Sequence, residues 1–255
     1  MSAVTLQTAG GLAVLTLDNV ERHNAFDRAM LGQLDAHLDM VRDAEDVRAV
    51  ILTGTGPKAF CVGADINEWA GLSPREFARD WVHNGHRIFD KLARLPQPTI
   101  AAVNGYAFGG GLELVAACDV RVLAPKAHLA LPEAGIGVVP GWSGTQRLVR
   151  LMPEPMVREM AQFGRRVMPE RAVAAGFAVS IAEDTLTEAK TIAADVLKRS
   201  PFATDLVKSM INAAVNEDSP VAIEALASAA VAASADLAEG VAAFREKRSP
   251  DFKGA

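Results

Sequence analysis

The sequence predicts an α/β fold, because strand patterns and helix patterns alternate along the chain up to about Ser143. Short β-branched runs that end at glycine, such as residues 48–53, are typical of buried strands. Between these runs, apolar residues recur at spacings of three to five, which is typical of helices that bury one face. The chain has 255 residues, of which 50% are hydrophobic, so it can bury a substantial core.

The N-terminal segment predicts two strands, a helix and a third strand. Residues 4–8 and 12–17 alternate between apolar and polar positions around a turn at residues 9–11. A helical pattern follows from Ala25, and its apolar positions are Phe26, Met30, Leu31, Leu34, Leu38 and Val41. The run RAVILT at residues 48–53 then predicts a buried strand that ends before Gly54.

The middle of the chain continues the alternation. A glycine-punctuated segment leads into a helix that begins near Asp65, and residues 73–94 are predicted as helix, with Ser73 as N-cap before Pro74. Two prolines end that helix and precede a strand at residues 99–103. A glycine-rich helix, a strand at residues 119–123 and a short strand around Leu129 follow.

After Ser143 the pattern is helical, with one possible strand at residues 178–181. Pro201 follows a helix that ends in Lys198 and Arg199, which indicates a boundary. We therefore expect a core with the functional site in residues 1–200 and a helical region in residues 201–255.

Composition excludes several classes of protein. The net charge of −5 and the pI of about 5.6 argue against nucleic acid or an anionic membrane as the main partner. No segment approaches the roughly 20 uninterrupted apolar residues that span a membrane, and the first residues lack a secretory signal pattern. Cys61 and Cys118 both lie in apolar segments, which predicts buried, reduced thiols. We expect a cytoplasmic protein.

The segment GYAFGGGLELVAACDVR, residues 105–121, carries the strongest chemical signal. Glycines 109–111 stand directly before an apolar helical run that contains one carboxylate, Glu113. Glycines allow a ligand to approach the backbone, and the first turn of a helix has free N–H groups that stabilise negative charge. Glu113 is flanked by Leu112 and Leu114, and a buried carboxylate is costly unless it is hydrogen-bonded or functional. This combination favours chemistry on a carbonyl group.

Three collinear segments resemble the crotonase (enoyl-CoA hydratase/isomerase) superfamily. They are KAFCVGADINEW at residues 58–69, NGYAFGGGLELVAACDVR at residues 104–121 and LPEAGIGVVPGWSGTQRL at residues 131–148. The segments ERHNAF and EGVAAFREKRSPDFKG resemble the family's two ends. The resemblance implies a crotonase-like spiral of ββα repeats with a helical C-terminal trimerisation region, and a homotrimer or a homohexamer of two trimers.

The resemblance also implies the chemistry. The backbone N–H groups of Ala64 and Gly110 would form an oxyanion hole for a thioester oxygen. Glu113 would deprotonate a water molecule, and Glu133 would give a proton to Cα. Because both family glutamates are present, the closest match is an enoyl-CoA hydratase, which adds water in syn fashion to a 2-trans-enoyl-CoA and forms a 3-hydroxyacyl-CoA. No metal or cofactor is implied beyond the CoA of the substrate.

Further residues belong to the substrate-binding set that the resemblance implies. Near the oxyanion hole these are Val62, Asp65 and Ile66, with Asp65 favoured as a helix N-cap over a catalytic role. Gly141 matches a glycine on the water side of the pocket. Arg22, Phe244 and Lys247 are candidates for contact with CoA, the last two from a neighbouring subunit. The family often has small residues where Trp142 and Ser143 stand, so the acyl pocket is either shortened or adapted to an aromatic or polar acyl group.

Three alternatives stay open on the sequence alone. A Δ3,Δ2-enoyl-CoA isomerase would shift a double bond with one carboxylate, and a hydrolase or dehalogenase would place another side chain at one of the glutamate positions. A non-catalytic binding protein on the same scaffold is the third, because a fold does not fix a function.

Overall fold

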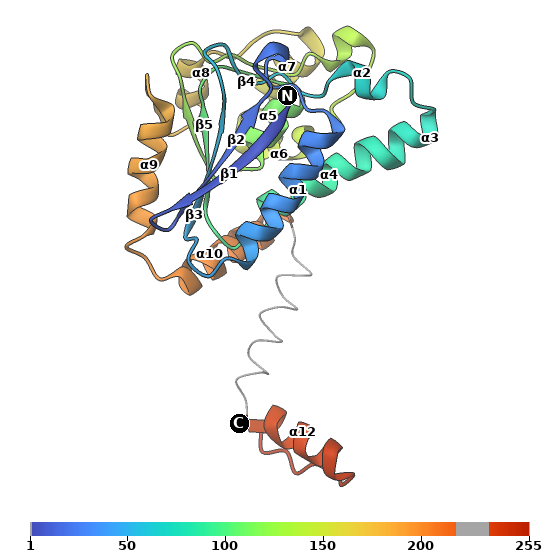
Figure 1. Ribbon diagram of the computed structural model, residues 1–255, viewed down its shortest axis with the longest axis vertical. Helices are drawn as coiled ribbons and strands as arrows, with labels where there is room; N and C mark the ends of the chain where they lie inside the picture. The colour runs from blue at the N-terminus through green and yellow to red at the C-terminus, as the bar shows by residue number, and fades with distance from the viewer. Residues whose placement is uncertain (1, 218–234, 255) are drawn as a thin grey trace. The chain divides into compact units, whose positions relative to one another are not determined.

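The computed structural model describes residues 2–217 and 235–254, which fall into two units, residues 1–204 and 205–255. The first unit is built on two sheets (Figure 1). The larger sheet contains β1 (Ala3–Ala9), β2 (Leu12–Asp18), β3 (Ala49–Gly54), β5 (Thr99–Val103), β7 (Val120–Leu123) and β9 (Ser180–Ile181), in that order. The smaller sheet contains β4 (Ala59–Cys61), β6 (Tyr106–Phe108) and β8 (Leu129–Ala130).

All strand pairs are parallel except the hairpin of β1 and β2. In the larger sheet Ile100 lies between Ile51 on one side and Val120 on the other, so the central strands are buried on both faces. This explains why they are apolar runs instead of alternating strands. The predicted α/β alternation is confirmed, and so are the strands at 99–103 and 178–181, the second as the two residues of β9.

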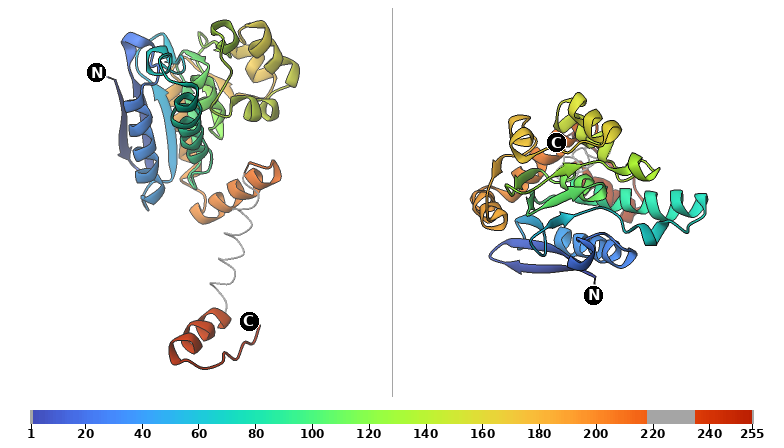
Figure 2. Two further views of the ribbon diagram at one scale, coloured as in Figure 1. Left: turned by 90° about the vertical axis from the view of Figure 1, so that its right-hand side faces the viewer. Right: turned by 90° about the horizontal axis from the view of Figure 1, so that it is seen from above.

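Helices of the first unit cover both faces of the larger sheet. The helices of the described residues are α1 (Arg28–Asp43), α2 (Ile66–Trp69), α3 (Pro74–Glu76), α4 (His83–Ala93), α5 (Gly110–Ala116), α6 (Gly144–Leu151), α7 (Glu154–Phe163), α8 (Pro169–Ala174), α9 (Thr185–Val196), α10 (Pro201–Ala214) and, in the second unit, α12 (Ala235–Glu246). A π-helical segment, η2 (Phe77–Val82), joins α3 to α4, and 3₁₀ turns occur at η1 (Val20–Arg22) and η3 (Glu133–Ile136). Figure 2 shows α1 beside the β1–β2 hairpin, and Figure 1 shows α9 on the opposite face.

Two apolar clusters hold these layers together. The larger cluster joins α1, α4 and α5 to one face of the sheet and includes Leu15, Leu34 and Leu114, all fully buried. The smaller cluster packs Ala189 and Ala193 of α9 against Ile51 of β3. Cys61 and Cys118 are free thiols within the larger cluster, as the sequence predicts.

The ends of two helices follow from their caps. The Asp27 side chain accepts a hydrogen bond from the Met30 N–H, so α1 begins at Arg28, three residues later than the apolar pattern suggested. Ser73 and Glu76 form a reciprocal capping box at the start of α3, which confirms the predicted start of the 73–94 run.

Among the described residues, the second unit contains the end of α10 and α12. The boundary at residue 201 and the helical region that follows it stay a prediction. In the part of the chain that the structure describes, no helix has both the length and the apolar character of a membrane span.

Candidate active site

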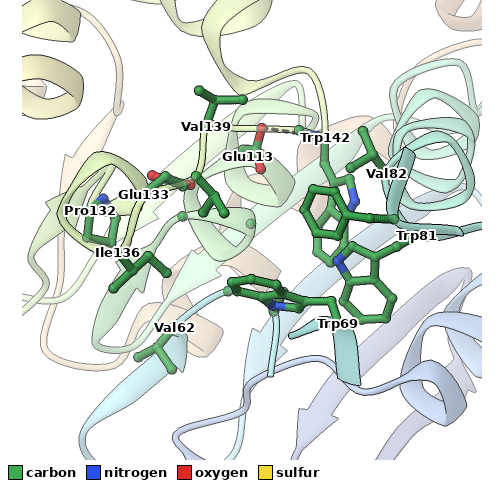
Figure 3. Close-up of a pocket in the computed structure, with 17 residues that line it drawn as sticks. Val62, Trp69, Trp81, Val82, Glu113, Pro132, Glu133, Ile136, Val139 and Trp142 are labelled. Carbon is green, nitrogen blue, oxygen red and sulfur yellow. Dashed lines mark hydrogen bonds between the residues drawn. The ribbon is translucent and has the colours of Figure 1, made fainter. Parts of the chain in front are cut away.

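A pocket of about 560 Å³, including its open mouth, lies beyond the C-terminal ends of the three strands of the smaller sheet, beside the first turn of α5. Backbone from residues 62–64 and 109–110 forms one wall. Two carboxylates, Glu113 and Glu133, face the space, and the remaining lining is mainly apolar (Figure 3). The pocket therefore combines a mainly apolar lining with a small number of polar groups, as small-molecule sites do.

Ala64 is held in place by its two neighbours along the chain. The Phe26 N–H donates to the Gly63 carbonyl at 2.8 Å, and the Asp65 N–H donates to the Phe26 carbonyl at 2.8 Å. Because successive backbone groups of extended chain alternate in direction, the Ala64 N–H points away from Phe26. Within the described residues it has no hydrogen-bond acceptor, and Ala64 lines the pocket.

Gly110 is the first residue of α5, so its N–H has no acceptor within the helix. Gly109 before it has φ of +52°, a conformation that favours glycine, and this turns the chain from β6 into the helix. A Cβ atom added to Gly63 would lie 3.1 Å from the Gly110 nitrogen, so the two backbone segments are in van der Waals contact. The amides of Ala64 and Gly110 thus belong to one wall of one pocket.

Glu113 is buried in the second half of the first turn of α5, with 2% of its surface exposed. Its Oε1 atom accepts hydrogen bonds from the backbone N–H groups of Trp142 and Gly144, both at 2.8 Å. Burial raises the pKa of Glu113 above its ordinary value, while these two N–H donors and the charge of Arg147 oppose the shift. The donors give its ionised form a fixed orientation.

The turn that supplies these donors has a network of its own. Ser143 lies between them with φ of +75°, and its Oγ is 3.3 Å from His86 Nδ1. His86 Nε2 lies 3.4 Å from Asp90, and Asp90 accepts a 2.5 Å hydrogen bond from the buried Arg147. The turn before α6 is therefore fastened to α4, and the orientation of Glu113 depends on that attachment.

Glu133 begins the 3₁₀ turn η3 directly after Pro132, three residues beyond the end of β8. Its Oε2 atom is buried, and no group in the described residues hydrogen-bonds to it. Burial raises the pKa of Glu133 to about 7, and the charge of Glu113 adds to the shift. Glu133 is thus a carboxyl group that can hold its proton near neutral pH.

The two carboxyl groups differ in what surrounds them. Two N–H donors orient one oxygen of Glu113 and favour its charge, whereas none of the described residues donates to Glu133 Oε2. Such a pair exchanges protons and titrates jointly, and this difference favours the charge on Glu113 and the proton on Glu133. The site can therefore present a base and an acid to one bound molecule, beside two amides that have no acceptor in the described part of the chain.

Of the other predicted site residues, some line the pocket and others do not. Val62 and Gly141 line the pocket. Asp65 caps α2 by accepting from the Asn67 N–H, and it pairs with the Arg22 guanidinium. Burial acts to raise the pKa of Asp65, but the Asn67 N–H and the Arg22 guanidinium outweigh it, so the pKa is lowered. Ile66 is 48% exposed at the start of α2 and is not among the lining residues.

Phe244 and Lys247 belong to the second unit. Phe244 lies within α12, and its side chain is outside what the structure describes; Lys247 is exposed just after that helix. Their contact with CoA stays a prediction.

Sequence reasoning missed the aromatic wall of the pocket. Trp69, Phe77 and Trp81 line it, together with Val82, and the last three lie in the π-helical segment η2. π-Turns are frequent at functional sites because they shift side chains out of the regular helical positions. The tryptophans themselves were the available signal, because large aromatics so close to a predicted pocket must either fill or line it.

Within residues 2–217 and 235–254, no group of three or more His, Cys, Asp or Glu side chains is placed to hold a metal ion. Cys61 is fully buried, and burial raises the pKa of its thiol to about 12, so it is neutral.

Comparison with known proteins places this site in a family context. The family model described as enoyl-CoA hydratase/isomerase matches residues 7–255. The crotonyl-CoA hydratase of Syntrophomonas wolfei is 35% identical over 253 residues, which cover 98% of this chain and 97% of that protein. The short-chain-enoyl-CoA hydratase of Clostridium acetobutylicum is 33% identical over 252 residues, with 97% and 96% covered.

Solved structures are also similar to this chain in both fold and sequence. The crystal structure of an enoyl-CoA hydratase from Bacillus anthracis superposes with a TM-score of 0.80 at 34% identity, and the match covers 99% of each chain. The structure of DspI from Pseudomonas aeruginosa superposes with a TM-score of 0.81 at 33% identity, covering 98% of this chain and 96% of that one.

Proposed function

Since this chain belongs to the enoyl-CoA hydratase/isomerase family, whose members act on acyl-CoA thioesters, and has the crotonase fold, we propose that it is an enoyl-CoA hydratase. The reaction is syn addition of water to a 2-trans-enoyl-CoA, which gives a 3-hydroxyacyl-CoA. One observation carries the proposal: Glu113 and Glu133, in different environments, face the same pocket beside the amides of Ala64 and Gly110, which have no acceptor among the described residues.

In the proposed mechanism the thioester oxygen accepts hydrogen bonds from the Ala64 and Gly110 N–H groups. As water adds to Cβ, electrons move through Cα to the carbonyl, and the oxygen becomes enolate-like. Preset amides stabilise this charge without reorganisation, and the loss of one such donor in other enzymes costs about 3 kcal/mol. The apolar wall strengthens the effect, because hydrogen bonds to a charge are stronger in a low dielectric.

The two carboxyl groups then move the protons. Ionised Glu113 takes one proton from the attacking water, whose oxygen forms a bond to Cβ, and protonated Glu133 donates its proton to Cα. The atoms of one water are thus added across the double bond. A proton passed from Glu113 to Glu133 restores the starting state. Because both groups face the substrate from one side of the pocket, the addition is syn.

This chemistry consists of proton transfers and one bond from oxygen to carbon, so we propose that it uses no cofactor apart from the CoA of its substrate. A homotrimer or homohexamer, and a cytoplasmic location, stay predictions.

The test is hydration of crotonyl-CoA, followed as loss of the enoyl-thioester absorbance and by identification of 3-hydroxybutyryl-CoA. Crotonyl-CoA is the substrate of choice because similar proteins are named for crotonyl- and short-chain enoyl-CoA. Glu113→Gln and Glu133→Gln should each reduce kcat by about 10²-fold to 10⁴-fold, the usual contribution of a general acid or base. The control is Glu45→Gln, an exposed glutamate that should leave kcat unchanged. A product with a shifted double bond and no hydroxyl would instead establish the isomerase alternative.

A further inference from the structure

The indole of Trp142 fills the gap between α4 and α5 at the catalytic end of the pocket. A Cβ atom added to Gly85 in α4 would lie 2.2 Å from its Nε1 atom. A Cβ atom added to Gly110 in α5 would lie 2.7 Å from its Cε3 and Cζ3 atoms. The indole therefore spans the distance between two glycines, and one of them carries a proposed oxyanion donor. A side chain at either glycine would displace the ring.

Three aromatic neighbours hold the indole in this position. Its ring centroid lies 5.2 Å from Phe89 and 6.2 Å from Phe26, both in edge-to-face geometry, and 5.5 Å from Trp81. Only 3% of Trp142 is exposed. Edge-to-face aromatic clusters are favourable, and a close-packed interior leaves little room for the ring to move aside. Trp142 is thus a fixed wall.

The pocket has an open side and a closed side. Ile136 and Val139 are 52% and 79% exposed, whereas Trp81 and Trp142 are 4% and 3% exposed. In Figure 3, Ile136 and Val62 lie below Glu133. Trp81, Val82 and Trp142 lie to the right of Glu113, away from Ile136 and Val62. The CoA moiety is large and charged, so it must remain at the open side. With the thioester oxygen at Ala64 and Gly110, the acyl chain beyond Cβ then runs toward Trp81 and Trp142.

We propose that Trp142 sets the depth of the acyl pocket and restricts this enzyme to short 2-enoyl-CoA substrates, of which the four-carbon crotonyl group fits best. The inference rests on the proposed hydratase function for the direction of the acyl chain. A longer chain reaches the indole, which cannot retreat because Gly85 and Phe89 lie behind it. This selects between the two alternatives that the sequence left open, a shortened pocket and one adapted to an aromatic or polar acyl group.

The first experiment measures kcat/KM of the wild-type protein for 2-enoyl-CoA substrates with four, six and ten carbons. One methylene in an apolar pocket changes kcat/KM by about 10-fold to 200-fold, so the ten-carbon substrate should be at least about tenfold poorer than crotonyl-CoA. A value that stays constant or rises from four to ten carbons overturns the proposal. Calorimetric binding of butyryl-CoA and decanoyl-CoA provides a reading without turnover, with weaker binding expected for decanoyl-CoA.

Variants then assign the limit to Trp142. Trp142→Ala should raise the ratio of ten-carbon to four-carbon kcat/KM by at least about tenfold, because it frees the space of the indole. Trp142→Phe removes less volume, keeps an aromatic ring in the core and should raise the ratio for the six-carbon substrate. The matched control is Phe177→Ala, a fully buried aromatic that does not line the pocket; it should leave both ratios unchanged.

The outcomes separate the two proposals. If no enoyl-CoA is hydrated, the hydratase proposal fails, and the binding of butyryl-CoA against decanoyl-CoA still tests the depth of the pocket. If crotonyl-CoA is hydrated and folded Trp142→Phe keeps the wild-type ratios, the assignment to Trp142 is wrong. Should circular dichroism show Trp142→Ala to be unfolded, Trp142→Phe and the wild-type profile decide the question.

Discussion

Glu133→Gln should stabilise this protein above pH 7 while it removes the proposed proton donor. Glutamine has nearly the same shape as glutamic acid but stays neutral at every pH. In the folded protein the pKa of Glu133 is raised to about 7 by burial and by the charge of Glu113, whereas its ordinary value is 4.5. The folded state therefore keeps a proton that the unfolded chain has already released. Between those two pH values the native state becomes steadily less stable, and above about pH 7 the loss is complete.

The size of the effect follows from the two pKa values. The interval between 4.5 and about 7, at 1.36 kcal/mol per pH unit, corresponds to about 3 kcal/mol. This is an upper bound, because the mouth of the pocket is open to solvent. For a chain of this size, about 1 kcal/mol shifts Tm by roughly 2–4 °C, so the full effect is about 6–12 °C. Below pH 4.5 the wild type and the variant should unfold together.

Thermal unfolding followed by circular dichroism at pH 4.5 and pH 8 measures this difference. Glu45→Gln is the matched control, since it makes the same chemical change at an exposed position, and its Tm should stay close to that of the wild type at both values of pH. The reasoning is refuted if Glu133→Gln gains no more Tm at pH 8 than at pH 4.5, or no more than the control. A gain at pH 8 alone means that the site stores a stability cost for function.

Two further predictions concern activity. The proposed mechanism requires protonated Glu133, so kcat/KM for crotonyl-CoA should fall about tenfold per pH unit above about 7; a profile that stays flat to pH 9 contradicts this. Gly144→Ala places a Cβ atom 2.4 Å from Glu113 Cγ, and displacement of this proposed general base should reduce kcat/KM by about 10²-fold. Gly32→Ala is its control in the same assay, because a Cβ atom added there meets no atom within 4 Å outside its chain neighbours and its own helix backbone. Equal rates for the two variants would count against the placement of Glu113.

Local sequence signals were sufficient to predict the elements that are bounded by proline or glycine residues. The strand at residues 99–103 follows two prolines and precedes an Asn-Gly pair, and its bounds agree with β5. Strands β4 and β6 were missed, because each has three residues and lies in a glycine-punctuated segment without measurable periodicity. Their pairing, such as Ala59 with Tyr106, joins segments far apart in the chain. Pairing of that kind has no local signal.

In the candidate site, too, some features could be predicted from local sequence and others depend on packing. Burial of Glu113 was predictable from Leu112 and Leu114 on either side of it, and the structure confirms it. Its hydrogen bonds from the turn at residues 142–144 were not, because they depend on how α6 packs against α5. For Trp142 the sequence indicates a bulky residue near the pocket. Where the ring lies depends on a glycine in another helix, Gly85, so only the packing reveals it.

The most direct measurement is the position of deuterium in the product of crotonyl-CoA hydration in D₂O. If Glu113 and Glu133 act on one molecule from the same side of the pocket, NMR should show 3-hydroxybutyryl-CoA with one deuterium on C2, on the same face as the new hydroxyl group. Deuterium on the opposite face, or exchange at carbon without a hydroxyl group, would contradict the pairing of the two carboxyl groups over a single double bond.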